Sequence, residues 1–190
     1  MIRGDKVLLR PIEETDYPLL HRWMNHPEVW HYMDYERPFS MEDIKEDVEL
    51  ARREGEPFII CVGDRPVGRI GLNRFRGRDR TCGIYMFIGE PAFWGQGFAR
   101  DAVLALLSYA FERMDLHQVE LWALGDNDRA VAMYRRCGFV EEARLRERSF
   151  NQGGWVDHIV MSVNREEFLK ARASSRDANR EPDRGDRTSR

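Results

Sequence analysis

Two glycines one residue apart, Gly95 and Gly97, lie between an apolar strand-like run and a long helical pattern. Glycine lets the backbone turn tightly and expose successive N–H groups, because no Cβ obstructs them. A helix that begins near Phe98 would add unpaired N–H groups and the positive end of its dipole. The segment therefore predicts an anion site suited to a pyrophosphate. A glycine turn that serves packing alone is the alternative.

Two familiar phosphate loops can be compared with this segment. The P-loop pattern G-x-x-x-x-G-K-S/T does not occur in the sequence. The dinucleotide pattern G-x-G-x-x-G matches at Gly95 and Gly97, but Arg100 stands where the third glycine should be. That glycine permits close packing of helix on strand. A Rossmann-type oxidoreductase is therefore disfavoured.

A second group of residues with chemical potential lies downstream, where Asn127 follows a strand-like run and Tyr134 comes seven residues later. Seven residues are about two helical turns, so the two side chains share one helix face. Asn127 can either cap the helix or bond a ligand. Tyr134 can be either a half-buried core residue or a proton donor.

The spacing of apolar residues alternates between helical and strand-like periods along the elements that must position these residues. Helical patterns begin at Thr15 or Asp16, at the capping box of Ser40, and near Phe98, while a short helix at residues 127–137 ends before Gly138. The expected buried positions are Leu19, Leu20, Trp23, Met24; Met41, Ile44, Val48, Ala51; and Val103, Leu106, Leu107, Ala110, Phe111. Strands are expected at residues 6–11, 57–62, 66–75, 81–88, 118–124, 139–150 and 155–163. Closely spaced strands form antiparallel hairpins, so the pattern predicts a mixed α+β fold rather than a doubly wound one.

Together the two chemical segments resemble the GNAT superfamily of acyl-CoA-dependent N-acetyltransferases. The family's loop reads Q/R-x-x-G-x-G/A and is followed by N-x-x-S/A-x-x-x-Y-x-K/R-x-G-F. The sequence gives Trp94-Gly95-Gln96-Gly97-Phe98-Ala99, and then Asn127, Ala130, Tyr134, Arg136, Gly138 and Phe139 in the same spacing. The tryptophan variant of the loop and the segment 22–29 resemble the Rim-type branch, which comprises ribosomal-protein N-terminal acetyltransferases and their small-molecule relatives. The resemblance spans residues 6–168.

The resemblance implies a mostly antiparallel sheet with flanking helices, in which the fourth and fifth strands splay apart to admit the pantetheine arm. It also implies acetyl-CoA as co-substrate, attacked directly by an amine within a ternary complex. Tyr134 would be the general acid that protonates the departing thiolate. The residues that would hold acetyl-CoA are Phe87, Ile88, Trp94, Gly95, Gln96, Gly97, Phe98, Ala99, Arg100, Asn127, Ala130, Tyr134 and Arg136. A non-catalytic acyl-CoA-binding module of the same fold is the alternative, although Tyr134 in register argues against it.

The base that would deprotonate the amine is left open by the sequence. Many relatives carry a glutamate on the fourth strand, where the matching residue here is Gly83. Glu90, Glu120 and His31 are the candidates that remain.

The acceptor side of this fold is usually framed by the first two helices and the last hairpin. Glu28, Trp30, His31 and Tyr32 are the predicted acceptor contacts, followed by Asp34, Tyr35 and Glu36. An aromatic and acidic mixture suits a cationic amine, by ion pairing and cation–π contact. The acceptor would be a polyamine, an aminoglycoside-like compound or a peptide N-terminus. The acidic residues between 42 and 49 are expected on a solvated helix face.

Composition limits the classes of protein to which this sequence can belong. The chain has 190 residues and a formal charge of −3, which disfavours a cationic nucleic-acid binder. The longest near-continuous apolar stretch, residues 103–111, is about half of a bilayer span, and no export signal is visible, so a cytoplasmic protein is expected.

The cysteines and histidines give two further expectations. Three scattered cysteines predict free thiols, and histidines spaced by five predict no metal site. Residues 1–170 are expected to form one domain, with 171–190 as a disordered charged tail. Many members of the superfamily pair, which is compatible with a homodimer.

Overall fold

The protein is described here by a computed structural model covering residues 1–33, 35, 37–151 and 153–178. One eight-stranded sheet has the order β1-β2-β3-β4-β5-β6-β8-β7, and every neighbouring pair is antiparallel except β5–β6. The strands are β1 Ile2–Arg3, β2 Leu8–Pro11, β3 Glu56–Val62, β4 Arg65–Arg76, β5 Thr81–Ile88, β6 Gln118–Leu124, β7 Val140–Asn151 and β8 Gly154–Asn164. The mixed α+β fold is therefore confirmed.

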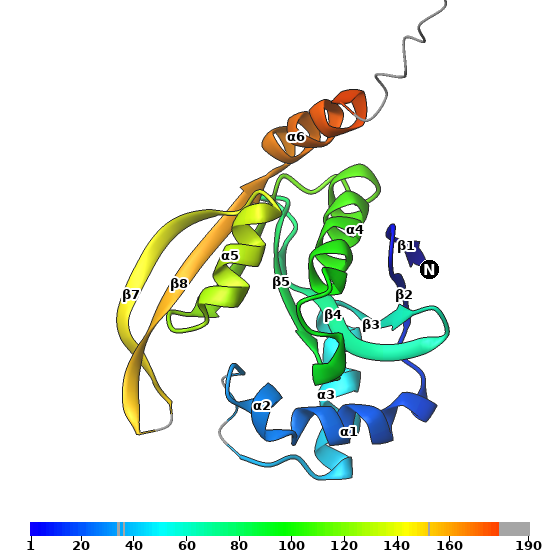
Figure 1. Cartoon of the computed structure of the whole chain (residues 1–190), viewed down its shortest axis with the longest axis vertical. Helices are drawn as coiled ribbons and strands as arrows, with labels where there is room; N and C mark the ends of the chain where they lie inside the picture. Colours follow the sequence, from blue (N-terminus) through cyan, green and yellow to red (C-terminus); the bar gives the residue numbers. More distant parts are fainter. Residues whose placement is uncertain (34, 36, 152, 179–190) are drawn as a thin grey trace, which may run out of the picture.

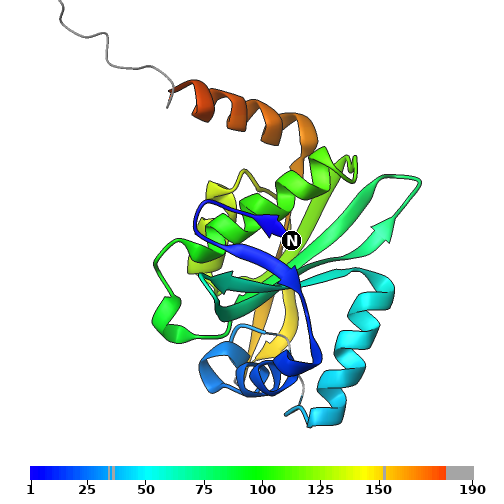
Figure 2. The same cartoon turned by 90° about the vertical axis from the view of Figure 1, so that its right-hand side faces the viewer.

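Helices cover both faces of the sheet. They are α1 Tyr17–Met24, α2 Pro27–Trp30, α3 Met41–Glu54, α4 Phe98–Glu112, α5 Asp128–Arg136 and α6 Arg165–Ala178, with short 3₁₀ turns η1 Glu14–Asp16 and η2 Pro91–Phe93. One apolar core joins α4 and α5 to the sheet, and a second joins α1 and α3 to it. Figures 1 and 2 show α1–α3 at one end of the molecule and α6 projecting from the other. No helix in the described part of the chain is long and apolar enough to cross a membrane.

The feature that matters most for function is the opening between β5 and β6. These parallel strands pair only over Thr81–Gly83 and Gln118–Glu120, so within the described residues the rest of β5 has no strand beside it on that edge. In Figure 1, β5 and the β7–β8 hairpin diverge from the level of α4 downwards. Since β1 is a short extra strand, β5 and β6 are the fourth and fifth strands of the expected fold, and their predicted splaying is confirmed.

Local sequence signals explain several boundaries. Ser40 accepts a hydrogen bond from the Asp43 backbone N–H (3.1 Å) while Asp43 accepts one from the Ser40 N–H (2.6 Å), which is the predicted capping box. Gly138 follows α5 with φ of +97°, in the left-handed region that glycine adopts without strain.

Other expectations were wrong, for physical reasons. Asp16 is the N-cap residue of α1, but its carboxylate does not cap the helix, because it is held at 2.7 Å by Arg10 in a largely buried ion pair. Met41 is exposed rather than buried, and β2 begins at Leu8 rather than at residue 6. The short α2 was not expected. The disordered tail was predicted from residue 171, but α6 extends from Arg165 to Ala178; residues 179–190 lie outside the described part.

Candidate active site

A cavity of about 530 Å³ lies where β5 and β6 part. Its lining comes from both faces of the sheet. Tyr134 and Met133 of α5 belong to the face covered by α4 and α5, where the alternating β6 residues Leu121 and Ala123 also pack. Trp122 lies between those two on β6, and side chains alternate along a strand, so it points to the opposite face. The cavity therefore passes through the sheet.

The first wall of the cavity is the glycine turn before α4. Gly95 and Gly97 have φ of +75° and +84°, and a Cβ at Gly95 would meet nothing within 4 Å. Gly97 is the N-cap of α4 and no side chain caps that end. The first N–H groups of the 15-residue helix therefore lack intrahelical partners and lie beside the cavity, as an anion site requires.

Lys6, which the sequence analysis did not identify as a site residue, supports this turn. The Lys6 ammonium donates to the Gln96 carbonyl at 3.2 Å and lies 3.4 Å from where a Gly97 Cβ would stand. Asp101, in the first turn of α4, fixes the segment by accepting from the backbone N–H groups of Asp5, Lys6 and Val7. A positive charge is thereby held against the proposed pyrophosphate loop.

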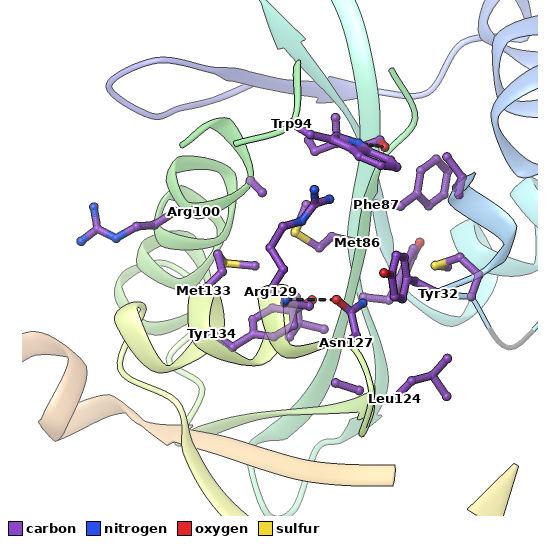
Figure 3. A pocket seen from close by; sticks show the side chains of 18 of the residues that line it. Tyr32, Met86, Phe87, Trp94, Arg100, Leu124, Asn127, Arg129, Met133 and Tyr134 are labelled. Atoms are coloured by element: carbon purple, nitrogen blue, oxygen red, sulfur yellow. Dashed lines mark hydrogen bonds between the residues drawn. The ribbon is translucent and has the colours of Figure 1, made fainter. Parts of the chain in front are cut away.

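Three arginines line the same half of the cavity: Arg100, Arg129 and Arg136. Figure 3 shows that Arg129 points between the other labelled side chains towards Trp94, whereas the Arg100 guanidinium points away from them. The Arg129 guanidinium lies 4.5 Å from the centroid of the Trp94 ring, within cation–π range. Coenzyme A carries a pyrophosphate and a further phosphate, so this donor set fits its charged end.

Two of the predicted coenzyme contacts already make hydrogen bonds within the protein. Asn127 is the N-cap of α5, with its Oδ1 accepting from the Ala130 N–H at 3.1 Å. The Ile88 carbonyl accepts the Trp94 indole N–H at 2.8 Å. The Gln96 side chain donates to the Ala92 carbonyl and does not line the cavity, unlike the other predicted coenzyme contacts.

Tyr134 lies on α5 with its ring edge-on to Phe139, the centroids 5.6 Å apart. Its side chain is buried and lines the cavity. Burial raises the pKa of the Tyr134 hydroxyl well above its usual value, and the nearby Cys137 thiol adds to that effect. The group therefore stays protonated at neutral pH, which is the state that a general acid needs.

None of the three candidate bases lines the cavity. Glu90 is held by Arg22 and by the Trp23 indole N–H at 2.8 Å, and Glu120 lies 3.7 Å from the Arg74 guanidinium. The space above Gly83 is also filled: a Cβ there would stand 2.5 Å from Asn73 Oδ1 and 2.6 Å from Arg74 Nη2. A longer side chain at this position would have to displace both residues.

The predicted acceptor contacts divide into two pairs. Glu28 and Tyr32 line the cavity, whereas Trp30 and His31 do not; Asp34 and Glu36 fall outside the described residues. The sequence analysis missed several lining residues on this side: Arg74, Tyr85, Trp122 and His158. Alternation along β6 and β8 could have indicated the last two, but only once the strand register was known.

The described residues include no group of three or more His, Cys, Asp or Glu that could hold a metal ion. Cys61, Cys82 and Cys137 are free and buried, as predicted.

A splayed sheet, a glycine turn before a long helix and a buried tyrosine along one cavity fit an acyl-CoA-dependent transferase. The chain belongs to the GNAT family, since the acetyltransferase (GNAT) domain matches residues 6–140. It is an N-acetyltransferase that uses acetyl-CoA as co-substrate and an amine as acceptor.

Similar proteins agree with this assignment. The spermidine N(1)-acetyltransferase of Vibrio cholerae is 27% identical over 169 residues, which cover 87% of this chain and 97% of that protein. The Escherichia coli K12 enzyme of the same name is 25% identical, with 89% and 91% covered. The structure of the Vibrio cholerae enzyme with CoA and spermine has a TM-score of 0.81 at 26% identity, covering 87% of this chain and 99% of that one. A ribosomal L7/L12 α-N-protein acetyltransferase in complex with coenzyme A (TM-score 0.76, 85% and 95% covered) is 20% identical and supports the fold alone.

The glycine turn gives a first prediction. Gly97→Ala should weaken acetyl-CoA binding about tenfold, because an L-residue at a φ of +84° costs about 1–2 kcal/mol and the turn would relax away from its anion-binding shape. Isothermal titration calorimetry measures the affinity. Gly77→Ala is the matched control, since a Cβ at Gly77 would meet nothing within 4 Å and its φ is not positive. Equal affinities of both variants and the wild type would remove Gly97 from the phosphate site.

Proposed function

We propose that the acceptor is a small aliphatic polyamine, of which one primary amine is acetylated. The observation that carries this proposal is the wall of the acceptor half, where Glu28 lines the cavity together with Tyr32, Tyr85 and Trp122. A protonated alkylamine can pair with the carboxylate and lie against aromatic faces. The names of the Vibrio cholerae and Escherichia coli relatives support the same class.

Arg74 also lines this half and would repel a polycation if its charge were free. Its guanidinium lies 3.7 Å from the Glu120 carboxylate and 5.7 Å from the centroid of Trp122, so the charge is offset at close range. Glu28 has no cationic partner among the ion pairs of the described residues. A distal ammonium of the acceptor would therefore find Glu28 available.

Different residues along the cavity would bind the coenzyme and donate the proton. Acetyl-CoA, when bound, supplies the acetyl thioester. The N–H groups at the start of α4, with Lys6 and Arg129, would hold its phosphates, and the unpaired edge of β5 would hold its arm in the manner of an added strand. Tyr134 would hold a proton for the departing sulfur. Thiolate is a moderately good leaving group, since a thiol has a pKa of about 8.5, so one acid suffices.

A panel of acceptors tests the proposal. Purified protein with acetyl-CoA should release thiol fastest with spermidine or spermine, and more slowly with aminoglycosides, amino sugars and short peptides. Preference for a peptide N-terminus would replace the polyamine by the Rim-type alternative. Tight acetyl-CoA binding without turnover of any amine would indicate a binding module instead.

Glu28→Gln gives a sharper prediction for the same proposal. It should raise the KM for spermidine about fivefold with kcat nearly unchanged, because an exposed ion pair contributes about 1 kcal/mol. Steady-state kinetics at low and high salt measure the effect, which salt should reduce. Glu49→Gln, on the solvent-facing side of α3, is the matched control. An unchanged KM would remove Glu28 from the acceptor site.

The homodimer that the resemblance allows stays a prediction. Sedimentation equilibrium of the purified chain measures it directly.

A further inference from the structure

The acceptor half of the cavity contains one titratable ring that the mechanism above does not use. His158 lies on β8 opposite Leu124 of β6 and lines the cavity. Its neighbours along the strand, Ile159 and Met161, pack in the core beneath α4 and α5, and His158 is directed to the other face of the sheet. There it packs edge-on against Trp122, with ring centroids 6.0 Å apart.

The surroundings of this ring are unusual for a core histidine. Its side chain is more than nine-tenths buried, and its Nδ1 is a buried atom that has no hydrogen-bond partner in the described structure. Buried polar atoms in native proteins are nearly always paired, so an unpaired one calls for a functional explanation. The other ring nitrogen, Nε2, lies 2.7 Å from Ser149 Oγ.

An irregularity in β7 brings Ser149 to this place. Leu145 pairs with His158 and Ser149 pairs with Val156, so β7 uses four residue steps where β8 uses two. Such bulges re-aim side chains and are over-represented beside active sites. If Nε2–H donates to Ser149 Oγ, the lone pair of the neutral ring is on Nδ1.

We propose that His158 is the general base of this enzyme, with Ser149 as the positioning residue that fixes its tautomer. The proposal builds on the amine acetylation assigned above and supplies the group that Gly83 lacks. Nδ1 is covered in the structure, and the acceptor has to displace a neighbour to reach it. Trp122 is 44% exposed and packs edge-on against the ring, so it is the neighbour that we expect to move.

The proton transfer balances without any further reactant. An N–H bond of the acceptor ammonium breaks and leaves its electron pair on nitrogen, which becomes the nucleophile. The proton forms a bond with the lone pair of Nδ1 and makes an imidazolium, which later releases it to solvent. A neutral imidazole suits this step because one ring nitrogen carries a lone pair that can accept the proton.

Charged and titratable groups from several elements line the same cavity or lie on the strand beside this ring. Glu28 and Tyr32 come from α2 and the segment after it, Arg74 from β4 and Tyr85 from β5. The β7 irregularity carries Arg146, Glu147 and Arg148. A pH profile reports this whole set, so the test compares variants rather than relying on one curve.

His158→Gln is the decisive variant, because glutamine keeps hydrogen-bonding capacity but cannot serve as a base. With any amine that the wild type acetylates, kcat/KM at neutral pH should fall by about 10²-fold. The defect should shrink as pH rises towards about 10, where an alkylamine loses its proton unaided. His117→Gln, at an exposed histidine far from the cavity, is the matched control.

A loss that is the same at every pH, or no loss, would overturn the proposal, because a structural role does not depend on the protonation of the amine. Failure of spermidine alone, with another amine acetylated, would overturn only the proposed acceptor class.

A second measurement keeps the test independent of the stability of the variant. Two-bond ¹H–¹⁵N spectra of the wild-type protein, with the ring neutral, report which nitrogen of His158 carries the proton. We expect a protonated Nε2 and a bare Nδ1; the opposite tautomer would exclude Nδ1 as the base.

Discussion

Tyr134→Phe should lower kcat by about 10²-fold while leaving acetyl-CoA affinity nearly unchanged. The substitution removes one hydroxyl from a buried ring whose packing against Phe139 it preserves. Loss of a positioned proton donor typically costs about 10²–10⁴-fold, and thiolate needs only modest help to depart, so the low end is expected. Pre-steady-state kinetics and calorimetric titration separate the chemical step from binding.

The raised pKa of Tyr134 adds a pH dependence to this prediction. Because burial holds the hydroxyl protonated well above its usual titration range, the wild type should keep its acid across neutral and mildly alkaline pH. Tyr109→Phe, on α4 and away from this cavity, is the matched control. An unchanged kcat in Tyr134→Phe would assign the acid role to another group.

Asp47→Asn should destabilise the fold by about 3 kcal/mol and raise the KM for the acceptor. Asp47 of α3 pairs with Arg69 of β4, whose side chain is 4% exposed. Arg69 in turn donates to the Tyr85 hydroxyl at 3.4 Å and lies 5.3 Å from the centroid of that ring, which lines the acceptor half. Removing one partner leaves a buried charge uncompensated, which costs about 3–5 kcal/mol; the low end applies because Asp47 is itself 35% exposed.

Urea unfolding measures the loss of stability, and steady-state kinetics measures the shift in KM. Glu42→Gln breaks an exposed pair with Lys45 on the same helix and should cost less than about 0.5 kcal/mol. Adding Arg69→Met to Asp47→Asn should restore much of the stability, because the buried charge is then gone. A cost below about 1 kcal/mol for Asp47→Asn would show that water reaches Arg69 and compensates it.

The parts of the site that depend on local sequence could be predicted. The glycine turn, the N-terminus of α4 and the face shared by Asn127 and Tyr134 follow from spacing within one segment, and the structure places them along one cavity. The strand boundaries of β5 and β6 were also predicted correctly, because their apolar runs are bounded by clear turn residues.

The parts that depend on strand register could not be predicted. Whether His158 faces the cavity or the core is decided by its alignment with Leu124, and a slip of one residue would reverse it. Glu90 is a plausible base in the sequence, yet Arg22 and Trp23, more than sixty positions away, hold its carboxylate. The Arg74 side chain covers Gly83. Arg74 has a φ of +49° and lies where the register of β4 with β5 is irregular, which the sequence does not reveal.

The passage of the cavity through the sheet has a kinetic consequence. Glu28 and Tyr32 line it on the predicted acceptor side, and Arg129 and Arg136 line it on the predicted coenzyme side. One cavity therefore joins the two sides, which leaves room for both substrates at the same time. We expect any fixed order of addition found by product inhibition to reflect movement of the protein.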